Sequence, residues 1–481
     1  MPGLIAQAHG SGTPAAWKRP LPAGRTEIHS VKNPDIRVAL VHLGCARNLI
    51  DSETILGRLG AEGFTLTHDV AAADVAVLNT CSFIGPAREE SEGWIRELLA
   101  RKQEGELRAV VVVGCLPEQF RGEVEAAYPE VDALLGLSDY SQIARVVEEV
   151  LRGRRVQPGA GGRRLAGASE GTRLLQTPRS YAYLRPSHGC DHQCAFCIIP
   201  AIRGRQRSKE VATVVEEVEP LVAAGVREVV LVAEDTTGYG TDFGPGGARL
   251  PDLVDRLAQV PGLAWLRIMY AYPHAFPWDL VEVMNRHGNV VPYLDIPIQH
   301  ISSPVLKQMR RGGTRQSVER ILERLRREIP GLTLRSTVLV GHPGEGEAEF
   351  QELLDFLAEF RFERLGAFAF SAEKNTPAGS QSHCSEEEAM ERLQAVMEQQ
   401  AEIHRQHQEA RIDCEIEVLV DGREGQEALA RSAADAPEVD ALVRIPDPAG
   451  NLQAGAMLKA RVVGADQYDL LAEASENPAL A

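Results

Sequence analysis

Short apolar runs alternate with helical segments through most of this 481-residue chain, and this alternation constrains the fold more than any other feature. The first three runs lie at residues 38–43, 75–78 and 109–113, with helical patterns at 51–62 and 86–104 between them. Continuous apolar strands separated by helices are typical of a parallel sheet covered on both faces. We therefore predict an N-terminal α/β domain built on a parallel sheet.

A cysteine stands just beyond each of these three strands. We call Cys45, Cys81 and Cys115 the dispersed cysteines. The strands of a parallel sheet all end at one edge, where open α/β folds bind ligands. A lone cysteine there is most often a small buried hydrophobe, but three at equivalent positions are hard to ascribe to packing. We therefore expect the dispersed cysteines to converge and to bind a metal centre.

Three further cysteines lie within eight residues of one another. Cys190, Cys194 and Cys197, called here the loop cysteines, have the spacing Cys-x-x-x-Cys-x-x-Cys. Cubane iron–sulfur clusters normally take one thiolate per iron, so three cysteines leave one iron open to a reactive ligand. The alternative is a zinc knuckle with His188 or His192 as fourth ligand, because structural zinc takes four nitrogen or sulfur ligands. We favour the iron–sulfur cluster.

The middle of the chain predicts a second, larger α/β unit. Six strand candidates lie at 181–187, 226–234, 263–271, 290–299, 332–341 and 364–371. Helical patterns fill the gaps, as at 211–224, where valines and a leucine share one face. Six consecutive strand–helix repeats predict a partial (β/α)6 barrel related to the closed eightfold one. The loop cysteines follow its first strand, on the rim where such barrels keep their chemistry.

The C-terminal part changes character. A charged helix is expected at 385–411, with Ser385 as its N-cap. Beyond it, about five short strands between Cys414 and Glu473 predict a small antiparallel β-barrel of the OB type. The expected organisation is a disordered extension at 1–34, the N-terminal domain at 35–150, a linker at 151–177, the partial barrel at 178–408, the small barrel at 409–475 and a tail at 476–481.

Composition limits the compartment and the partners. With 51 Lys and Arg against 68 Asp and Glu, the net charge of −17 should repel a phosphate backbone. No apolar stretch approaches the roughly 20 residues of a membrane helix, and the N-terminus lacks the apolar core of a secretory signal. Eight cysteines in so long a chain do not indicate a disulfide framework. We therefore expect a cytoplasmic protein without membrane contact.

The motifs resemble the methylthiotransferase family of the radical S-adenosylmethionine superfamily, over residues 35–473. The likeness rests on Leu43-Gly-Cys-Ala-Arg-Asn48, Asn79-Thr-Cys81, Gly114-Cys115, the loop cysteines, Arg203-Gly204, Asp295-Ile-Pro-Ile-Gln-His300 and Gly341-His-Pro-Gly-Glu345. The terminal barrel is similar to the TRAM domain of that family. The phrases Tyr270-Ala-Tyr-Pro-His274, Pro292-Tyr-Leu-Asp-Ile-Pro297, Ala430-Arg-Ser-Ala-Ala-Asp-Ala-Pro437 and Asp466-Gln-Tyr-Asp-Leu470 resemble members that modify a ribosomal protein.

The resemblance implies two [4Fe–4S] clusters and S-adenosylmethionine. The dispersed cysteines would hold a cluster whose open iron binds a sulfur that one S-adenosylmethionine methylates. The loop cysteines would hold the cluster that cleaves a second one, and the resulting radical would take a hydrogen from the β-carbon of an aspartate in protein twelve of the small ribosomal subunit. Phe196 fits the superfamily pattern, and Glu234, at a strand end, is expected near S-adenosylmethionine. An electron donor such as flavodoxin or ferredoxin is also implied.

Two alternatives stay open at this point. One is a family member that modifies an adenosine of transfer RNA, and the other is a non-enzymatic iron–sulfur or zinc scaffold. Residues 411–473 include six basic and thirteen acidic residues, and Tyr468 is the single aromatic residue among them. A barrel that binds single-stranded RNA normally has a basic groove with stacking aromatics, so RNA is not the expected substrate. The acidic residues expected to face a basic protein are Glu415, Glu417, Asp435, Glu438 and Asp440.

Overall fold

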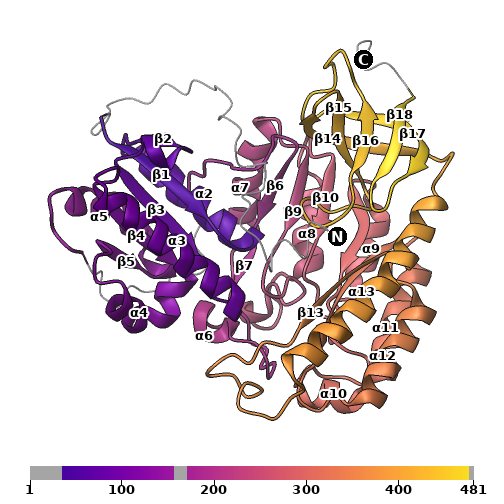
Figure 1. The fold of residues 1–481 in the computed structure, drawn as a ribbon. Coiled ribbons are helices and arrows are strands. Elements are labelled where there is room, and N and C mark those ends of the chain that lie inside the picture. The colour runs from indigo at the N-terminus through magenta and orange to yellow at the C-terminus, as the bar shows by residue number, and fades with distance from the viewer. Residues whose placement is uncertain (1–34, 157–170, 476–481) are drawn as a thin grey trace. The chain divides into compact units, whose positions relative to one another are not determined.

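The computed structural model describes residues 35–156 and 171–475. The predicted extension at 1–34, the tail at 476–481 and residues 157–170 of the predicted linker lie outside the described residues. The chain divides into two compact units (Figure 1). The first runs to Gln176 and also includes Ala201–Arg203, and the second consists of Thr177–Pro200 and the chain from Gly204 onward. The finer domain boundaries stay a prediction.

The first unit contains one parallel sheet with the strand order β2-β1-β3-β4-β5. Its strands are β1 (Arg37–His42), β2 (Thr65–Thr67), β3 (Val75–Thr80), β4 (Ala109–Gly114) and β5 (Ala133–Leu135). Its helices are α2 (Ala46–Ala61), α3 (Gly85–Gln103), α4 (Cys115–Ala127), α5 (Ile143–Leu151) and the short 3-10 helices η2 (Val70–Ala72) and η3 (Leu137–Gln142). The three predicted strands are present, and the three-residue strands β2 and β5 were too short to show a pattern.

Alternating side chains of these strands pack against helices on opposite faces. Val75 and Val77 of β3 belong to a buried cluster with residues of α2 and α5. Ala76 and Leu78, one position along, belong to another with residues of α3 and α4. Because successive side chains of a strand point to opposite faces, the sheet is buried on both sides. This confirms the predicted covered parallel sheet.

The second unit is built on a six-stranded, wholly parallel sheet with the order β13-β12-β11-β10-β9-β6. Its strands are β6 (Tyr181–Leu184), β9 (Glu228–Leu231), β10 (Trp265–Ile268), β11 (Val290–Asp295), β12 (Thr333–Val340) and β13 (Arg364–Ala369). The intervening helices are α7 (Val211–Ala223), α8 (Leu250–Ala258), α9 (Asp279–Arg286), α10 (Ser303–Gln308), α11 (Arg315–Glu328), α12 (Glu347–Phe360) and the 3-10 helix η4 (Thr241–Phe243). The short helix α6 (Ile199–Arg203) begins in the second unit, and its residues Ala201–Arg203 group with the first. A two-stranded hairpin, β7 (Ser187–His188) with β8 (Arg207–Ser208), flanks the cysteine loop. The predicted partial barrel is confirmed.

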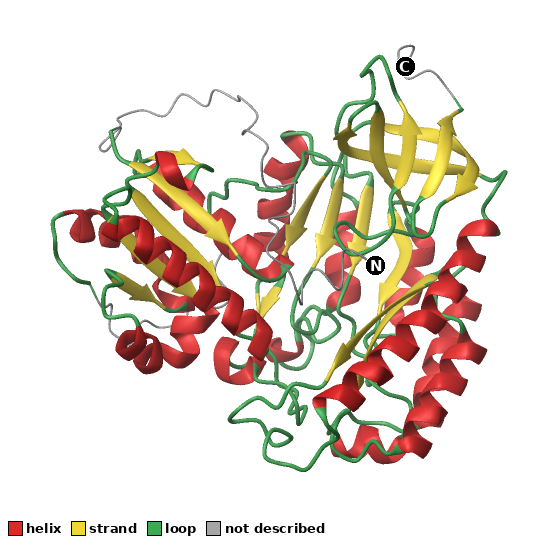
Figure 2. Ribbon diagram, viewed as in Figure 1, coloured by secondary structure: helices red, strands yellow, loops and turns green. Residues whose placement is uncertain are grey.

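A long helix, α13 (Glu386–Glu409), leads to the small barrel. The Ser385 hydroxyl caps this helix by accepting a hydrogen bond from the Glu388 amide at 3.1 Å. The barrel, drawn as the group of yellow strands near the C-terminus in Figure 2, closes in the order β14-β15-β16-β18-β17. Its strands are β14 (Glu415–Glu424), β15 (Glu427–Ser432), β16 (Val443–Pro446), β17 (Met457–Ala465) and β18 (Leu470–Ala474). The predicted small β-barrel is confirmed; its strand pairs are antiparallel except for the parallel pair β16–β18. A closed ring with an odd number of strands cannot alternate direction at every pair.

The segment between β15 and β16, residues 433–442, packs against the partial barrel inside the second unit, and we call it the base loop. Asp435 forms an ion pair with Arg364. The Asp440 carboxylate accepts a hydrogen bond from the Tyr293 hydroxyl at 2.6 Å, and Glu438 accepts one from Tyr181 at 2.9 Å. The carboxylates of Asp435 and Asp440 are buried in these contacts, which corrects the expectation that they face a protein partner. Glu438 is exposed, and for it the expectation stays a prediction.

In the part of the chain that the structure describes, no helix combines the length and the apolar surface needed to cross a bilayer.

Candidate active site

The dispersed cysteines lie at the carboxyl ends of three neighbouring strands. Cys45 precedes the first residue of α2 as its N-cap, Cys81 follows the last residue of β3, and Cys115 is the first residue of α4. The strands concerned, β1, β3 and β4, are adjacent in the sheet. The structure therefore brings these three thiols to one edge, as parallel pairing requires.

Glycines allow the backbone to pass close to this site. Gly44 has φ +99°, and a Cβ atom placed on it would lie 2.9 Å from Cβ of Cys81. Gly114 has φ +105°, and its Cβ would lie 2.5 Å from Oδ1 of Asn79 and 2.6 Å from the carbonyl oxygen of Thr80. The left-handed φ and these contacts both favour glycine. The Gly-Cys pairs of the sequence are thus explained by close packing.

Hydrogen bonds from buried side chains connect the three strand ends. Nδ2 of Asn48 donates to the carbonyl oxygen of Leu43 at 2.5 Å. Nδ2 of Asn79 donates to the carbonyl oxygen of Asn48 at 3.0 Å. The Thr80 hydroxyl donates to the carbonyl oxygen of Val113 at 2.6 Å. These buried bonds fix the relative positions of the segments that carry the cysteines.

Burial dominates the electrostatics of the dispersed cysteines. It raises the pKa of the Cys81 thiol to about 11 and that of Cys115 to about 12, and the neighbouring cysteines add to the rise at both. Burial also acts to raise the pKa of Cys45, but the guanidinium groups of Arg47 and Arg203 outweigh it and lower that pKa below its ordinary value. A cation such as iron would reverse the effect of burial, because coordination stabilises the thiolate.

Arg203 is a residue of this site to which the sequence gave no role. It belongs to the short segment Ala201–Arg203 that groups with the first unit. Its guanidinium donates to Oδ2 of Asp51 at 3.0 Å and to Sγ of Cys115 at 3.8 Å, and Arg203 and Asp51 are both buried. The Arg203-Gly204 motif was the sequence signal that could have identified it.

The loop cysteines sit in a segment held by main-chain hydrogen bonds. The amide of Cys190 donates to the carbonyl oxygen of Gly204 at 3.1 Å. The amide of Ala195 donates to the carbonyl oxygen of Met309 at 2.8 Å, and its carbonyl oxygen accepts from the amide of Ala378 at 2.9 Å. Burial raises the pKa of Cys190 to about 12, with Asp235, Cys197 and Cys194 adding to the rise. The three loop thiols are thus close enough to influence one another.

Phe196 and Glu234, the two residues predicted to contact the cofactor, lie in different surroundings. The half-buried Phe196 packs on the buried cluster of Val305, Met309 and Leu339, with its ring centroid 6.0 Å from that of His342. The carboxylate oxygens of Glu234 are buried beyond the end of β9. Its neighbour Asp235 is the residue that bonds to the cysteine loop, because its Oδ2 lies 2.7 Å from Nε2 of His192. Asp235, Tyr272 and Arg311 were not predicted as site residues, and His192 was considered only as a ligand of the alternative zinc knuckle.

The dispersed cysteines and the loop cysteines provide two groups of thiols, which are the donors that iron–sulfur clusters use. Within residues 35–156 and 171–475, no three His, Cys, Asp or Glu side chains converge on the position of a single metal ion. A cubane makes a different demand, because each thiolate binds its own iron at a separate corner. The chemistry of the six thiols therefore fits two clusters, and their assignment as ligands stays a prediction.

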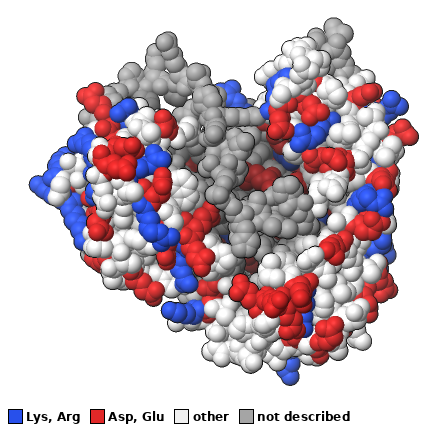
Figure 3. Space-filling view, viewed as in Figure 1, with Lys and Arg blue, Asp and Glu red and all other residues white. Residues whose placement is uncertain are grey.

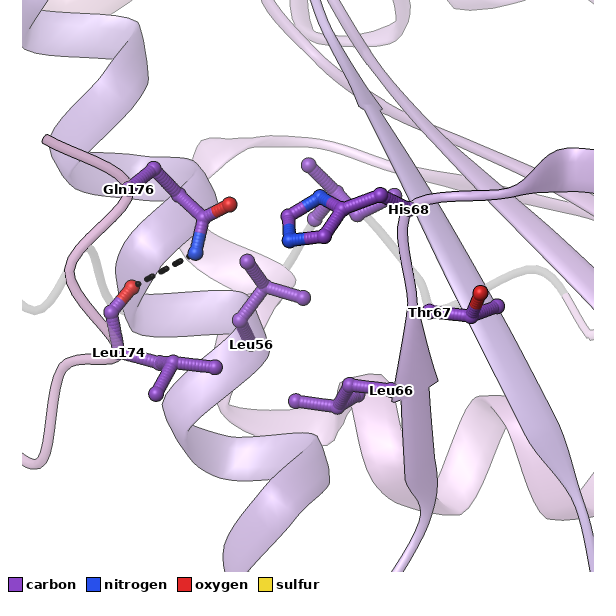
Figure 4. A pocket seen from close by; sticks show the side chains of 7 residues that line it. Leu56, Leu66, Thr67, His68, Leu174 and Gln176 are labelled. Carbon is purple, nitrogen blue, oxygen red and sulfur yellow. Dashed lines mark hydrogen bonds between the residues drawn. The ribbon is translucent and has the colours of Figure 1, made fainter. Parts of the chain in front are cut away.

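A cavity elsewhere in the first unit is too small for a cofactor. It has a volume of about 10 Å³ and is lined by residues such as Leu56, Leu66, His68 and Gln176 (Figure 4). Nε2 of Gln176 donates to the carbonyl oxygen of Leu174 at 3.2 Å. A volume of this size suits about one water molecule.

Three family models match the chain. Residues 37–136 match "Uncharacterized protein family UPF0004", residues 184–357 match the radical SAM superfamily, and residues 412–474 match the TRAM domain. The three matches follow the order of the N-terminal sheet, the partial barrel and the small barrel.

Similar proteins cover nearly the whole chain. One is the "Ribosomal protein uS12 methylthiotransferase RimO" of Porphyromonas gingivalis, 42% identical over 441 residues, which are 91% of this chain and 98% of that protein. The RimO of Geobacter sulfurreducens is 39% identical over 92% of this chain and 99% of its own length. The RimO of an Anaeromyxobacter species is 44% identical, over 90% and 92% respectively. The chain belongs to the RimO family. The RimO family consists of radical SAM methylthiotransferases, so the resemblance predicted from the motifs is confirmed.

The fold also occurs among solved structures. A radical S-adenosylmethionine methyltransferase, TsrM from Kitasatospora setae, with cobalamin and a [4Fe–4S] cluster bound, superimposes with a TM-score of 0.53 at 18% identity. The match covers 71% of this chain and 74% of TsrM, and at this identity it shows the fold alone. RimO-type enzymes use two [4Fe–4S] clusters and S-adenosylmethionine, as the sequence predicted.

Proposed function

We propose that this enzyme adds a methylthio group to the β-carbon of an aspartate in ribosomal protein uS12. The observation that carries the proposal is the presence of two separate groups of three thiols on one chain whose RimO relatives cover it almost completely. Hydrogen abstraction and sulfur donation are distinct tasks, and two cofactor sites provide for both.

The two groups of cysteines are assigned different roles. The loop cysteines bind the cluster that engages S-adenosylmethionine, and the dispersed cysteines bind the cluster that donates sulfur. When bound, these groups supply the radical and the sulfur that the protein itself cannot generate. The chain's own contribution is to fix the thiols through main-chain bonds at the loop and through buried amides at the sheet edge. Phe196 and Glu234 line the S-adenosylmethionine side of the loop in this proposal.

The surface of the small barrel suits a protein substrate of this enzyme better than an RNA substrate. Its single aromatic residue, Tyr468, stacks on His404 of α13 with ring centroids 5.7 Å apart. The Tyr468 carbonyl oxygen accepts hydrogen bonds from both His404 and Gln408 of that helix. A ring that already stacks within the protein is a poor platform for a nucleotide base. On the face drawn in Figure 3, acidic and basic side chains are interspersed on the barrel without a continuous basic band.

The exposed surface of the barrel is acidic even after the base loop is set aside. The exposed acidic residues outside that loop are Asp413, Glu415, Glu417, Glu424, Asp466 and Glu473, whereas the exposed basic ones are Lys459 and Arg461. Both exposed cations pair with barrel carboxylates, Lys459 with Glu415 at 3.1 Å and Arg461 with Glu473 at 3.8 Å. A negative surface of this kind attracts a basic ribosomal protein.

The decisive experiment uses the full chain, purified without oxygen and loaded with iron and sulfide to about eight irons per chain. It is incubated with uS12, S-adenosylmethionine and a chemical reductant, and the products are examined by mass spectrometry. We expect uS12 to gain the mass of one methylthio group at an aspartate. A uS12 variant with asparagine at that position should stay unmodified. Modification of transfer RNA with uS12 left unchanged would overturn the proposal.

The docking surface has its own test. Replacement of Asp413, Glu417 and Asp466 by Lys should raise the KM for uS12 about tenfold or more. The increase in KM should be larger at low salt, because added salt screens the attraction between opposite charges. The matched control reverses Glu104, Glu123 and Glu130, exposed residues of the first unit, and should leave the KM unchanged. Equal effects from the two sets would contradict docking on the barrel.

We further propose a cytoplasmic site of action and a small electron-transfer protein such as flavodoxin or ferredoxin as reductant. Both follow from the chemistry, because the substrate is a ribosomal protein and the radical step consumes one electron.

A further inference from the structure

An arginine side chain lies directly against the cysteine loop. Nη1 of Arg311 is 3.6 Å from Sγ of Cys194, in hydrogen-bonding geometry. Nη2 of the same guanidinium donates to the carbonyl oxygen of Pro297 at 2.5 Å. Arg311 is 8% exposed, so the positive charge stands in a largely dry environment beside the thiol. Arginine does not lose its proton in proteins, and this charge is therefore permanent.

An aromatic ring supports the guanidinium. Cζ of Arg311 lies 4.1 Å from the ring centroid of Tyr272, and the Tyr272 hydroxyl donates to the carbonyl oxygen of Arg311. The His192 ring stacks on the same tyrosine at 3.7 Å with an interplanar angle of 11°. A ring has two faces, and one that is covered by a stacked imidazole leaves the other for the guanidinium. Tyr272 therefore lies between His192 and Arg311, and we call these three residues the arginine stack.

The stack is anchored at its far end. Nε2 of His192 lies 2.7 Å from Oδ2 of Asp235. The other carboxylate oxygen of Asp235 accepts hydrogen bonds from the Thr237 hydroxyl at 2.5 Å and from the Gly238 amide at 3.1 Å. His192 itself lies between two loop cysteines in the sequence. The loop is thus fixed both at Cys194 and at His192.

We propose that Arg311 is a positioning residue that raises the reduction potential of the cluster held by the loop cysteines. This inference rests on the proposed assignment of those cysteines as cluster ligands. Reduction adds one electron from an external low-potential donor and transfers no proton, so the reduced cluster is more negative by one charge. A hydrogen bond to a cluster sulfur and a nearby fixed cation both favour that state. The stack keeps the cation in place beside the loop thiol of Cys194.

The test measures the potential directly. The full chain with both clusters is titrated electrochemically, and the paramagnetic signal that changes on addition of S-adenosylmethionine is followed. In Arg311→Gln we expect the ratio of reduced to oxidised cluster at a fixed potential to fall about tenfold, which is 59 mV for one electron. Arg311→Lys keeps the charge but loses the planar fork, and the ratio should fall by less. Arg310→Gln, a change at the exposed neighbouring arginine, is the matched control and should leave the ratio unchanged.

The outcomes separate this inference from the assignment on which it rests. Loss of the S-adenosylmethionine-sensitive signal from a Cys194→Ala protein tests the assignment of the ligand, whereas the Arg311 variants test the tuning. An unchanged potential in Arg311→Gln with full iron content would overturn the inference. If Arg311→Gln binds no iron, Tyr272→Leu decides, because it removes the ring that supports the guanidinium and leaves Arg311 itself in place. A fall in its ratio of about threefold supports the role of the stack, and an unchanged ratio overturns it.

Discussion

The two groups of cysteines are built in opposite ways. The loop cysteines occupy eight consecutive residues whose main chain is bonded to neighbouring segments. The dispersed cysteines come from three strand ends between residues 45 and 115, and they meet only when the sheet is complete. In both groups burial raises thiol pKa values, and in both an arginine donates to one sulfur, Arg203 to Cys115 and Arg311 to Cys194. A similar electrostatic setting can thus be reached by local spacing or by tertiary assembly.

The largest expected effect is loss of one site with survival of the other. Replacement of the three loop cysteines by Ala should reduce S-adenosylmethionine cleavage about a thousandfold or more, to background, because these residues act as a unit. About four irons per chain should remain, bound by the dispersed cysteines. Iron analysis and assay of deoxyadenosine release check both points. Persistent cleavage would mean that the comparison assigns the radical chemistry to the wrong group.

A change of one methyl group should affect the dispersed cysteines alone. Gly114→Ala places Cβ 2.5 Å from Asn79 and forces a left-handed φ, at a cost of about 3 kcal/mol. We expect the iron content to fall by about half while S-adenosylmethionine cleavage without uS12 continues. Gly105→Ala is the matched control, because its φ is also left-handed, at +81°, but nothing lies within 4 Å of the added Cβ. Iron content that falls equally in both variants would show that strain, and not the close approach at the cysteines, is responsible.

Acid should act on the two units in different pH ranges. In the second unit, burial acts to raise the pKa of Asp435, but Arg364 and Arg411 outweigh it and lower that pKa to about 2. The Asp435 carboxylate therefore binds a proton less readily in the folded state than in the unfolded state. Its contribution to the free energy of unfolding is present above about pH 4 and is lost as the pH falls toward 2. We expect Asp435→Asn to remove on the order of 2 kcal/mol of this pH-dependent stability. The difference in melting temperature between wild type and variant should shrink below pH 4. A difference independent of pH would contradict the buried ion pair.

The smallest effect concerns His42 at the end of β1. Burial lowers the pKa of this histidine to about 4, although Asp51 opposes the shift. The unfolded state then binds the proton first, so the first unit loses stability as pH falls from about 6.5 to about 4. Because the side chain is only half-buried, the loss should be about 1 kcal/mol. His42→Gln should flatten the melting temperature of the first unit over this range. His68→Gln, at an exposed position, should leave the pH dependence in place.

The sequence predicted those parts that depend on local pattern or on strand order. Both sheets, the long helix and the convergence of the dispersed cysteines followed from apolar runs and from the common edge of parallel strands. The arginine stack could not be predicted, because Arg311, Tyr272 and His192 meet only through tertiary packing. The prediction for the barrel carboxylates was wrong at the buried positions for a similar reason. A charge count cannot distinguish Asp435, which is 1% exposed, from Glu417, which is exposed.

The base loop limits how this chain can be shortened. Arg267, Arg335 and Arg364 of the sheet bond to Ala433, Asp440 and Asp435 of the loop. Removal of the barrel would leave the buried Arg364 without its carboxylate, whereas Arg267 and Arg335 would keep Glu228 and Asp295. A buried charge that loses its partner is strongly destabilising. The barrel is therefore not a detachable module. A truncated gene that ends before residue 410 should give an aggregated product, and recombination between relatives should succeed only where the sheet and the loop come from the same parent.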